Sequence, residues 1–283
     1  MSVPVSPTRQ LLGRALREAR TAAGLSQHAV ATILDCSQGK INKLESGVVV
    51  VKDTDLRLLV KHLGIDEATA TRMVDLLDMV RRERGWSGRH ALIPPFFRRY
   101  QQSEQHAVHV RGWHAEAIPG LLQSERNMLT LLSVAGPDAL DDQVRNREER
   151  RQVFTANPDA QHHYILGEGA FHRIRSSRGP GVALDQVEHL LRTLDRHPQL
   201  AVQVLTYATN FVPGDFSIVT MPEGLDDFVY LERVNNADYL TKEKDLLAHD
   251  HAWSRLAEQA LSLEESRRHL ETLRNHLCDE SSD

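Results

Sequence analysis

The sequence predicts a mainly α-helical protein with two parts: an N-terminal five-helix bundle, and a C-terminal α+β domain in which helices wrap a small sheet. Its length of 283 residues exceeds the roughly 100 to 200 residues usual for one domain. Apolar residues recur at helical spacing up to about residue 80, whereas short strand-like runs appear only after residue 94. We therefore expect a bundle over residues 1–84, a hinge over 85–93, the α+β domain over 94–277 and a tail over 278–283.

The bundle is predicted from its helix start and stop signals. A first helix begins near Thr8, where leucines and alanines recur every three or four positions. A later helix can be capped by Asp53 or Thr54 and stops at Gly64, and Asp66 caps the next one. Between the first and the later helices lies the most informative stretch of the chain.

Residues 23–47 have the pattern of two short helices joined by a tight turn. Ser26 and Ser37 each precede a helical run and can accept a hydrogen bond from its first turn. In the second helix Ile41 and Leu44 share one side, and the opposite side carries Gln38, Gly39, Asn42 and Lys43. Amide side chains can bond an adenine edge with two hydrogen bonds, and lysine reaches guanine or phosphate. This polar face therefore suits the major groove of double-stranded DNA.

The stretch resembles the helix-turn-helix of the phage-repressor or xenobiotic-response-element (XRE) class of transcriptional regulators. The matching features are Ser26, Gln27, Ala31, the turn before Ser37, Ile41 and residues 45–47. The resemblance implies an ion pair between Arg20 and Glu45, and places Asp35 where relatives carry the glycine of the turn. It also implies a set of DNA-contacting residues: Arg17, Gln27, Ser37, Gln38, Gly39, Lys40, Asn42, Lys43 and Lys52.

The second half alternates between strand-like and helix-like stretches. Strands are predicted at residues 107–113, 163–166, 201–206, 216–221 and 228–233. Helices are predicted at residues 96–106, 121–132, 138–154, 182–196 and 236–277. One small sheet wrapped by helices accommodates both sets.

Residues 92–275 also resemble a known family, a domain of unknown function that follows an XRE-type helix-turn-helix in many regulators of high-GC Gram-positive bacteria. The likeness rests on Trp113, the segment 118–123 (IPGLLQ), the arginine-rich run 145–151, Glu168, and residues 203–205 and 229–232. It implies regulation of development, secondary metabolism or stress genes, often together with a small protein encoded next door. It implies no catalytic activity and no cofactor.

Charge is divided unevenly along the chain. Residues 1–89 hold 14 Lys and Arg against 10 Asp and Glu, a net charge of +4, so that residues 90–283 carry −9 of the total of −5. The nucleic-acid footprint is therefore expected at the N-terminus. No leader or apolar run long enough to cross a membrane is found, and two cysteines indicate no disulfide framework, so we expect a cytoplasmic protein, associated with the nucleoid when bound to DNA.

Other clusters have competing interpretations. The histidine pairs lack the spacing of a metal site, and no nucleophile or phosphate-loop motif is present, so neither a metal site nor a catalytic residue is predicted. Two strand-end pairs, Glu168 with Arg173 and Glu232 with Arg233, form either a polar pocket or solvated charges. The aromatic residues Trp113, Phe171, Tyr230 and Trp253 form either core or a ligand cavity, with core favoured. The run 145–151 is a helix face, an inter-subunit surface or a second DNA contact.

Two functional hypotheses follow. The first is a sequence-specific transcriptional regulator that binds a palindromic operator as a homodimer, with a C-terminal domain that receives a signal or a protein partner. The alternative is an antitoxin-like interaction module that mainly binds a small neighbour-encoded protein and regulates its own promoter.

Overall fold

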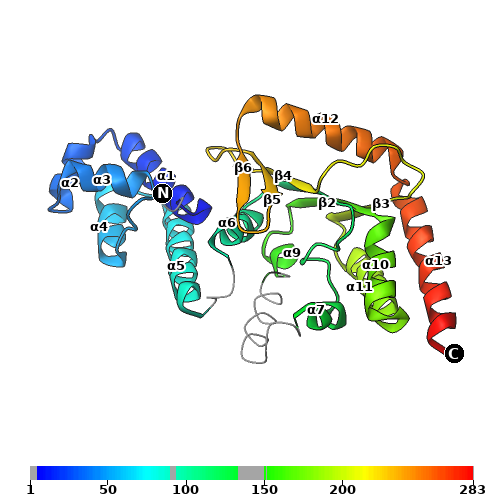
Figure 1. Ribbon diagram of the computed structural model, residues 1–283. Coiled ribbons are helices and arrows are strands. Elements are labelled where there is room, and N and C mark those ends of the chain that lie inside the picture. The colour runs from blue at the N-terminus through cyan, green and yellow to red at the C-terminus, as the bar shows by residue number, and fades with distance from the viewer. Residues whose placement is uncertain (1–4, 90–93, 133–149, 151, 283) are drawn as a thin grey trace. The chain divides into compact units, whose positions relative to one another are not determined.

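The computed structural model describes residues 5–89, 94–132, 150 and 152–282 (Figure 1). The chain divides into two compact units, residues 1–91 with 222–225, and residues 92–221 with 226–283. In the part described, no helix is both long and apolar enough to span a membrane. The protein is mainly helical, with one mixed sheet in the second unit.

The first unit is a helical bundle. Its helices are α1 (Pro7–Ala22), α2 (Gln27–Ile33), α3 (Gln38–Glu45), α4 (Asp53–Leu63) and α5 (Glu67–Arg89). The hydroxyls of Ser26 and Ser37 accept from the first turns of α2 and α3 as predicted, and Gly64 ends α4 in the left-handed conformation. The expected cap of α4 is wrong: Lys52 occupies the capping position without a side-chain bond, because the helix already begins at Asp53.

The core of the first unit holds α3 against α1. Ile41 and Leu44 of α3 are 2% and 3% exposed and pack with Leu12 and Leu16 of α1. The two helices approach closely at Gly13, where an added Cβ would lie 2.7 Å from the carbonyl oxygens of the last turn of α3. A side chain at this position would force α3 away from α1.

Helix α5 extends past residue 84, the predicted end of the bundle, although the division between the two units at residues 91 and 92 falls inside the predicted hinge. The sequence predicts a hinge from residue 85 because two glycines flank a tryptophan there, but the helix continues to Arg89. Glycine lowers helix propensity without forbidding a helix, so the preceding helical run extends through it. The remainder of the expected hinge, residues 90–93, lies outside the described residues.

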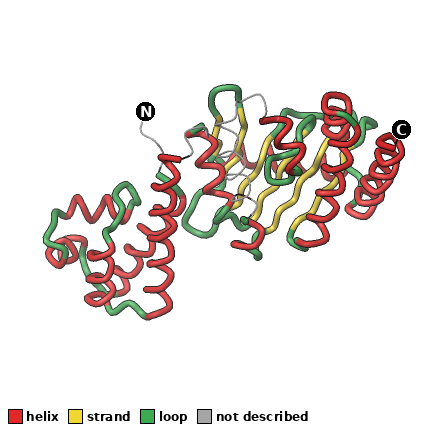
Figure 2. Tube along the Cα trace, turned by 90° about the horizontal axis from the view of Figure 1, so that it is seen from below, coloured by secondary structure: helices red, strands yellow, loops and turns green. Residues whose placement is uncertain are grey.

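The second unit is built on a mixed sheet (Figure 2). Its strands are β1 (His109–His114), β2 (Gln161–Gly167), β3 (Leu200–Leu205), β4 (Phe216–Thr220), β5 (Phe228–Glu232) and β6 (Ala237–Leu240). The spatial order is β3-β2-β1-β4-β5-β6. Pairing is parallel among β1, β2 and β3, and antiparallel from β1 through β4, β5 and β6.

Helices cover both faces of this sheet (Figure 1). They are α6 (Pro95–Glu104), α7 (Glu125–Leu132), α9 (Val153–Ala156), α10 (Glu168–Arg178), α11 (Pro180–Arg196), α12 (Glu243–Gln259) and α13 (Leu263–Ser282). Trp253 and Leu256 of α12 pack on Trp113 and Phe216 of one sheet face. Helices α6, α10 and α11 lie on the opposite face, and α13 packs along α11.

Several predicted elements need correction. The single helix expected over residues 236–277 is instead β6, α12 and α13, because Tyr239 pairs with Tyr230 as an edge strand and the chain breaks helix near residue 260. Helix α10 was not predicted, and α13 extends through most of the expected tail. The charged helix predicted over residues 138–154 lies largely outside the described residues, which include only Arg150 of its arginine run.

Candidate nucleic-acid interface

The recognition helix α3 presents one buried and one exposed side. Its aliphatic residues are in the core, whereas Gln38, Gly39, Asn42 and Lys43 are exposed. Near Gly39 an added Cβ would meet only the Ser37 hydroxyl, at 3.9 Å, so the backbone there is open to an approaching molecule. This amide-and-ammonium surface is free to meet base edges.

A buried carboxylate fixes this helix to its neighbours. Glu45, 5% exposed, accepts from Nε of Arg20 at 2.5 Å and from the amide of Gln27 at 2.8 Å. Nε of Arg17 lies 3.6 Å from the same carboxylate. One side chain of α3 therefore ties together α1, α2 and α3. The pair of Arg20 with Glu45 is the one implied by the resemblance, while the bond from Gln27 was not foreseen.

Electrostatics keep Glu45 charged. Burial alone would raise the pKa of Glu45, but hydrogen bonds from Arg20 and Gln27 and the positive charges of Arg20 and Arg17 outweigh it and lower the pKa below the usual value. A charged, fully bonded carboxylate is a strong orienting group in a partly buried site. The orientation of α3 thus depends on an ionised Glu45.

The other residues predicted to contact DNA differ in their exposure and in the partners that they already bind. Lys52 is exposed, and Arg17 keeps 55% of its side chain exposed despite its proximity to Glu45. Nζ of Lys40 is half-buried and lies 3.4 Å from Asp55 of α4. Gln27 has committed its amide nitrogen to Glu45, so a phosphate contact by this donor would require that bond to be exchanged. Within the described residues, the predicted contacts by Gln38, Asn42 and Lys43 of α3 require no such exchange.

The turn and the following loop complete the interface. Asp35 takes a φ of +46°, so it occupies the left-handed position of the turn, where the resemblance implies a glycine. After α3, Val48 and Val49 are exposed, and the guanidinium of Arg9 donates to the carbonyl of Val48. Arg9 of α1 therefore holds this loop beside α3.

Comparison with protein families agrees with this division of the chain. Residues 11–73 match the model of a helix-turn-helix domain. Residues 97–272, more than half of the chain, match the model of a domain of unknown function, DUF5753. The chain belongs to the DUF5753 family. Its N-terminal helix-turn-helix indicates a DNA-binding regulator. No curated protein and no solved structure is significantly similar to it.

In the DUF5753 domain the members of the two expected strand-end pairs, Glu168 with Arg173 and Glu232 with Arg233, do not bind each other. Glu168 accepts from the backbone N–H of Tyr207, and Arg173 pairs with Glu116 rather than with Glu168. Arg233 pairs with Asp238. Glu168, Arg173 and Arg233 thus bind other neighbours, so neither expected pair forms, and of the four charges only Glu232 lines a cavity.

The aromatic set is also divided. Trp113, Phe171 and Trp253 are at most 6% exposed and pack in the core, as favoured. Tyr230, by contrast, lines a cavity together with Glu232. Among the described residues no group of three or more His, Cys, Asp or Glu side chains is arranged to hold a metal ion, and both cysteines are free thiols.

Proposed function

We propose that this DUF5753 protein is a sequence-specific transcriptional regulator that reads DNA with the exposed side of α3. The observation that carries the proposal is the amphipathic geometry of that helix: Ile41 is 2% exposed while Gln38, Asn42 and Lys43 face solvent. Side chains of these types at the outer face of the second helix of a helix-turn-helix are placed to read the major groove.

The proposal includes a two-fold symmetric assembly. Helix-turn-helix proteins of this kind bind as dimers to half-sites about one helical turn apart, roughly 34 to 36 Å, so we expect a palindromic operator. The second unit would supply the dimer contacts and receive a signal or a protein partner. Its net charge of −9 over residues 90–283 would keep it away from phosphate and leave the reading to the first unit.

The test is retardation of a DNA fragment carrying the protein's own promoter. Replacing Gln38, Asn42 and Lys43 together by Ala should abolish specific retardation and leave the circular dichroism unchanged, because all three are exposed. Lys61→Ala is the matched control, since it removes one exposed lysine on α4 and should leave specific retardation intact. Specific binding that survives the triple substitution would overturn the assignment of the reading face.

The single substitutions distinguish reading from charge attraction. Asn42→Ala should reduce binding to the operator without changing binding to unrelated DNA. If Lys43 contacts a phosphate, Lys43→Ala should weaken binding to both DNA fragments and lower the slope of affinity against salt concentration by about one charge. Measuring affinity for both fragments over a series of salt concentrations resolves the two roles.

An antitoxin-like module remains the second candidate function, and the acidic charge of residues 90–283 favours it because such a surface suits a small basic protein. In that case the full chain should co-purify from its host with a stoichiometric neighbour-encoded protein. Purification as a homodimer that binds its promoter with no such protein present would exclude this candidate.

A further inference from the structure

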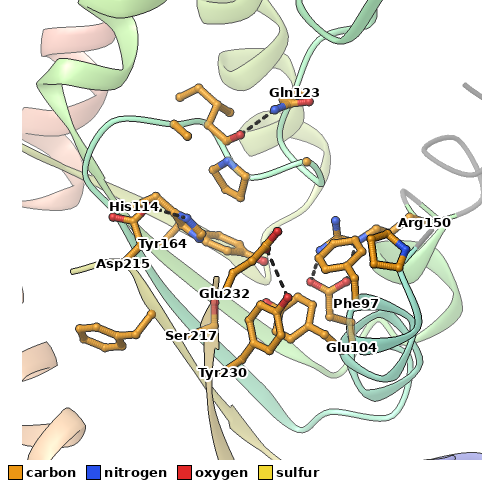
Figure 3. A pocket seen from close by; sticks show the side chains of 17 residues that line it. Phe97, Glu104, His114, Gln123, Arg150, Tyr164, Asp215, Ser217, Tyr230 and Glu232 are labelled. Atoms are coloured by element: carbon orange, nitrogen blue, oxygen red, sulfur yellow. Dashed lines mark hydrogen bonds and ion pairs between the residues drawn. The ribbon is translucent and has the colours of Figure 1, made fainter. Parts of the chain in front are cut away.

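A cavity of about 550 Å³ lies on the sheet face opposite α12 (Figure 3). Successive residues of a strand point to opposite faces, so Ile165 packs in the α12 core while Tyr164 faces the cavity. Ser217 of β4 and Tyr230 of β5 complete the floor. The volume lies within the roughly 300 to 1,000 Å³ of small-molecule sites.

The walls of the cavity are firmly held. Helix α6 forms one side, and the segment 118–120 forms the other. The amide of Gln123 donates to the carbonyl of Ile118 at 2.8 Å and closes this segment into a turn. The fully buried Gln186 of α11 then donates to Leu122 and accepts from the N–H of Ser124. A rigid wall of this kind is a preformed binding surface rather than a loose loop.

One polar group in the cavity lacks a partner. Tyr164 is 1% exposed, and within the described part of the chain its hydroxyl makes no hydrogen bond. Its ring lies over Gly112, where an added Cβ would come within 2.7 Å of it. Leaving a buried hydroxyl unpaired costs about 1 to 3 kcal/mol. A ligand with a polar atom would supply the missing hydrogen bond.

Arg150 does not make the cavity a site for anions. Its guanidinium binds both carboxylate oxygens of Glu104, at 2.6 Å and 2.7 Å, and both side chains are buried. Its positive charge is therefore neutralised inside the wall. The same guanidinium lies 5.0 Å from the ring centre of Phe97, so this aromatic lining already accommodates one cation.

The charges that remain in the cavity are negative. Glu232 lies at the exposed rim of the cavity, and Figure 3 shows its carboxylate directed inward beside Tyr230, whose hydroxyl donates to it at 3.2 Å. In the described residues no basic side chain lies within salt-bridge distance of Glu232. Asp215 also lines the cavity, 3.8 Å from His114. Burial alone would raise the pKa of Asp215, but the neighbouring imidazole of His114 and a hydrogen bond from the backbone N–H of Ala115 lower it below its usual value.

Aromatic faces adjoin these carboxylates. The rings of Tyr100 and Tyr230 stack with centroids 4.4 Å apart, and Phe97 lies 5.9 Å from Tyr100. The face of an aromatic ring carries negative charge and attracts a cation, most strongly where water is excluded. Carboxylates beside electron-rich rings form the surroundings that a protonated amine prefers.

We propose that this cavity binds a small organic cation, a protonated amine on an apolar body. The ammonium group would pair with Glu232 and hydrogen-bond the hydroxyl of Tyr164, while the apolar body would lie between Phe97 and the segment 118–120. The proposal names the class of ligand that the second unit would receive as a signal. Only the effect of that ligand on regulation rests on the proposed function. The binding itself does not depend on DNA.

Three probes with one body and different head groups test the charge preference. Calorimetric titration of the full chain at pH 7.5 would use 4-phenylbutylamine, 4-phenylbutan-1-ol and 4-phenylbutyrate. The amine should bind at least tenfold more tightly than the alcohol, and the carboxylate most weakly. The proposal would be overturned by equal affinity for the amine and the alcohol, or by stronger binding of the carboxylate. It would also be overturned if the amine did not bind up to about 10 mM, which is about tenfold above the Kd of a weak 1 mM complex.

Variants of the cavity test the assigned contacts. Glu232→Gln should weaken binding of the amine about tenfold and leave binding of the alcohol unchanged, and Tyr164→Phe should weaken the amine by a smaller factor. Glu264→Gln on α13, 84% exposed, is the matched control and should have no effect. Unchanged amine affinity in Glu232→Gln would reject the site. Because promoter retardation is measured separately, its failure and the failure of amine binding are distinguishable.

Discussion

Arg20 of α1 and Glu45 of α3 form a two-point ion pair, with Nε to Oε1 at 2.5 Å and Nη2 to Oε2 at 3.2 Å. The side chain of Glu45 is only 2% exposed and that of Arg20 16%. This pair joins the helix that would read DNA to the first helix of the bundle. The stability of the recognition helix should therefore depend on it.

Arg20→Ala should destabilise the first unit by about 2 to 3 kcal/mol, because it leaves a buried carboxylate with incomplete compensation. Urea denaturation followed by circular dichroism measures the loss. Arg57→Ala is the control: its guanidinium pairs with Asp53 at 2.8 Å but is 79% exposed, so its removal should cost under about 0.5 kcal/mol.

The same pair predicts a pH dependence. Because the pKa of folded Glu45 is lowered, its stabilising contribution is present above the ordinary carboxyl value of 4.5 and is lost as pH falls through the folded pKa. The difference between the wild type and Arg20→Ala should accordingly shrink at acid pH. A difference that stays constant from pH 7 to pH 3 would contradict a charged Glu45.

Gly39→Ala should separate stability from DNA binding. The added Cβ has room, and alanine is favoured in a helix by about 0.5 to 1 kcal/mol, so the folded bundle should become more stable. If DNA approaches the backbone of α3 closely, operator affinity should fall at least tenfold in a retardation assay. Gly214→Ala is the control: an added Cβ there meets no atom within 4 Å, and the substitution should leave the affinity unchanged. Full affinity in Gly39→Ala would show that the glycine is merely tolerated.

The buried pair of Glu104 and Arg150 should respond differently to single and double substitution. Arg150→Met leaves Glu104, 1% exposed, as an unpaired charge and should cost about 3 to 5 kcal/mol. Adding Glu104→Leu should recover most of that loss, because two apolar side chains need no charge compensation. Denaturation of the two variants, followed by the fluorescence of the buried tryptophans, measures both. A double variant less stable than Arg150→Met would show that the pair contributes net stability.

His162 should destabilise the second unit in mild acid. Burial lowers the pKa of His162 from 6.5 to about 4, and neither ring nitrogen has a hydrogen-bond partner among the described residues. The unfolded chain therefore binds a proton between pH 6.5 and 4 that the folded chain does not, so stability falls as pH falls in this window. From pH 7 to pH 5 the contribution of His162 to this loss should be about 2 kcal/mol, beside the contribution of His106, whose pKa burial also lowers to about 4.

His162→Phe tests this assignment, since a phenyl ring fills the same space beside Phe154 and cannot be protonated. Tryptophan fluorescence during urea denaturation at pH 7 and pH 5 should show a smaller loss in the variant. His251→Gln, at an exposed position on α12, should keep the full loss of the wild type. The same pH dependence in all three proteins would place the titrating group elsewhere.

The exposed face of α3 could be predicted because the relevant information is local. Helical spacing alone assigns Ile41 to the inner side and Asn42 to the outer side of α3, and the bundle confirms this exposure. The left-handed conformation of Asp35 agrees with the resemblance, which places this residue at the glycine position of the turn. The need for Gly13 was missed, because nothing within the first helix reveals that the carbonyls of α3 approach it.

The cavity could not be predicted, because its residues are far apart in the sequence. Glu104 and Arg150 meet across 46 positions, and Tyr230 joins them from a strand that pairs only after the sheet has formed. A strand pattern shows which residues share a face, but not which strands become neighbours. The pairing of Arg173 with Glu116 instead of Glu168 was missed for the same reason.

By itself, the sequence determined the two-part organisation, the helix-turn-helix with its capped helices, and the polar side chains offered by α3. These depend on periodicity and on caps within a few residues, where backbone geometry fixes the neighbours. Only the tertiary structure decided that Glu45 is the buried anchor of the recognition helix and that Tyr164, Tyr230 and Glu232 surround one cavity. Such groupings arise from packing between distant segments, and packing is set by the whole chain at once.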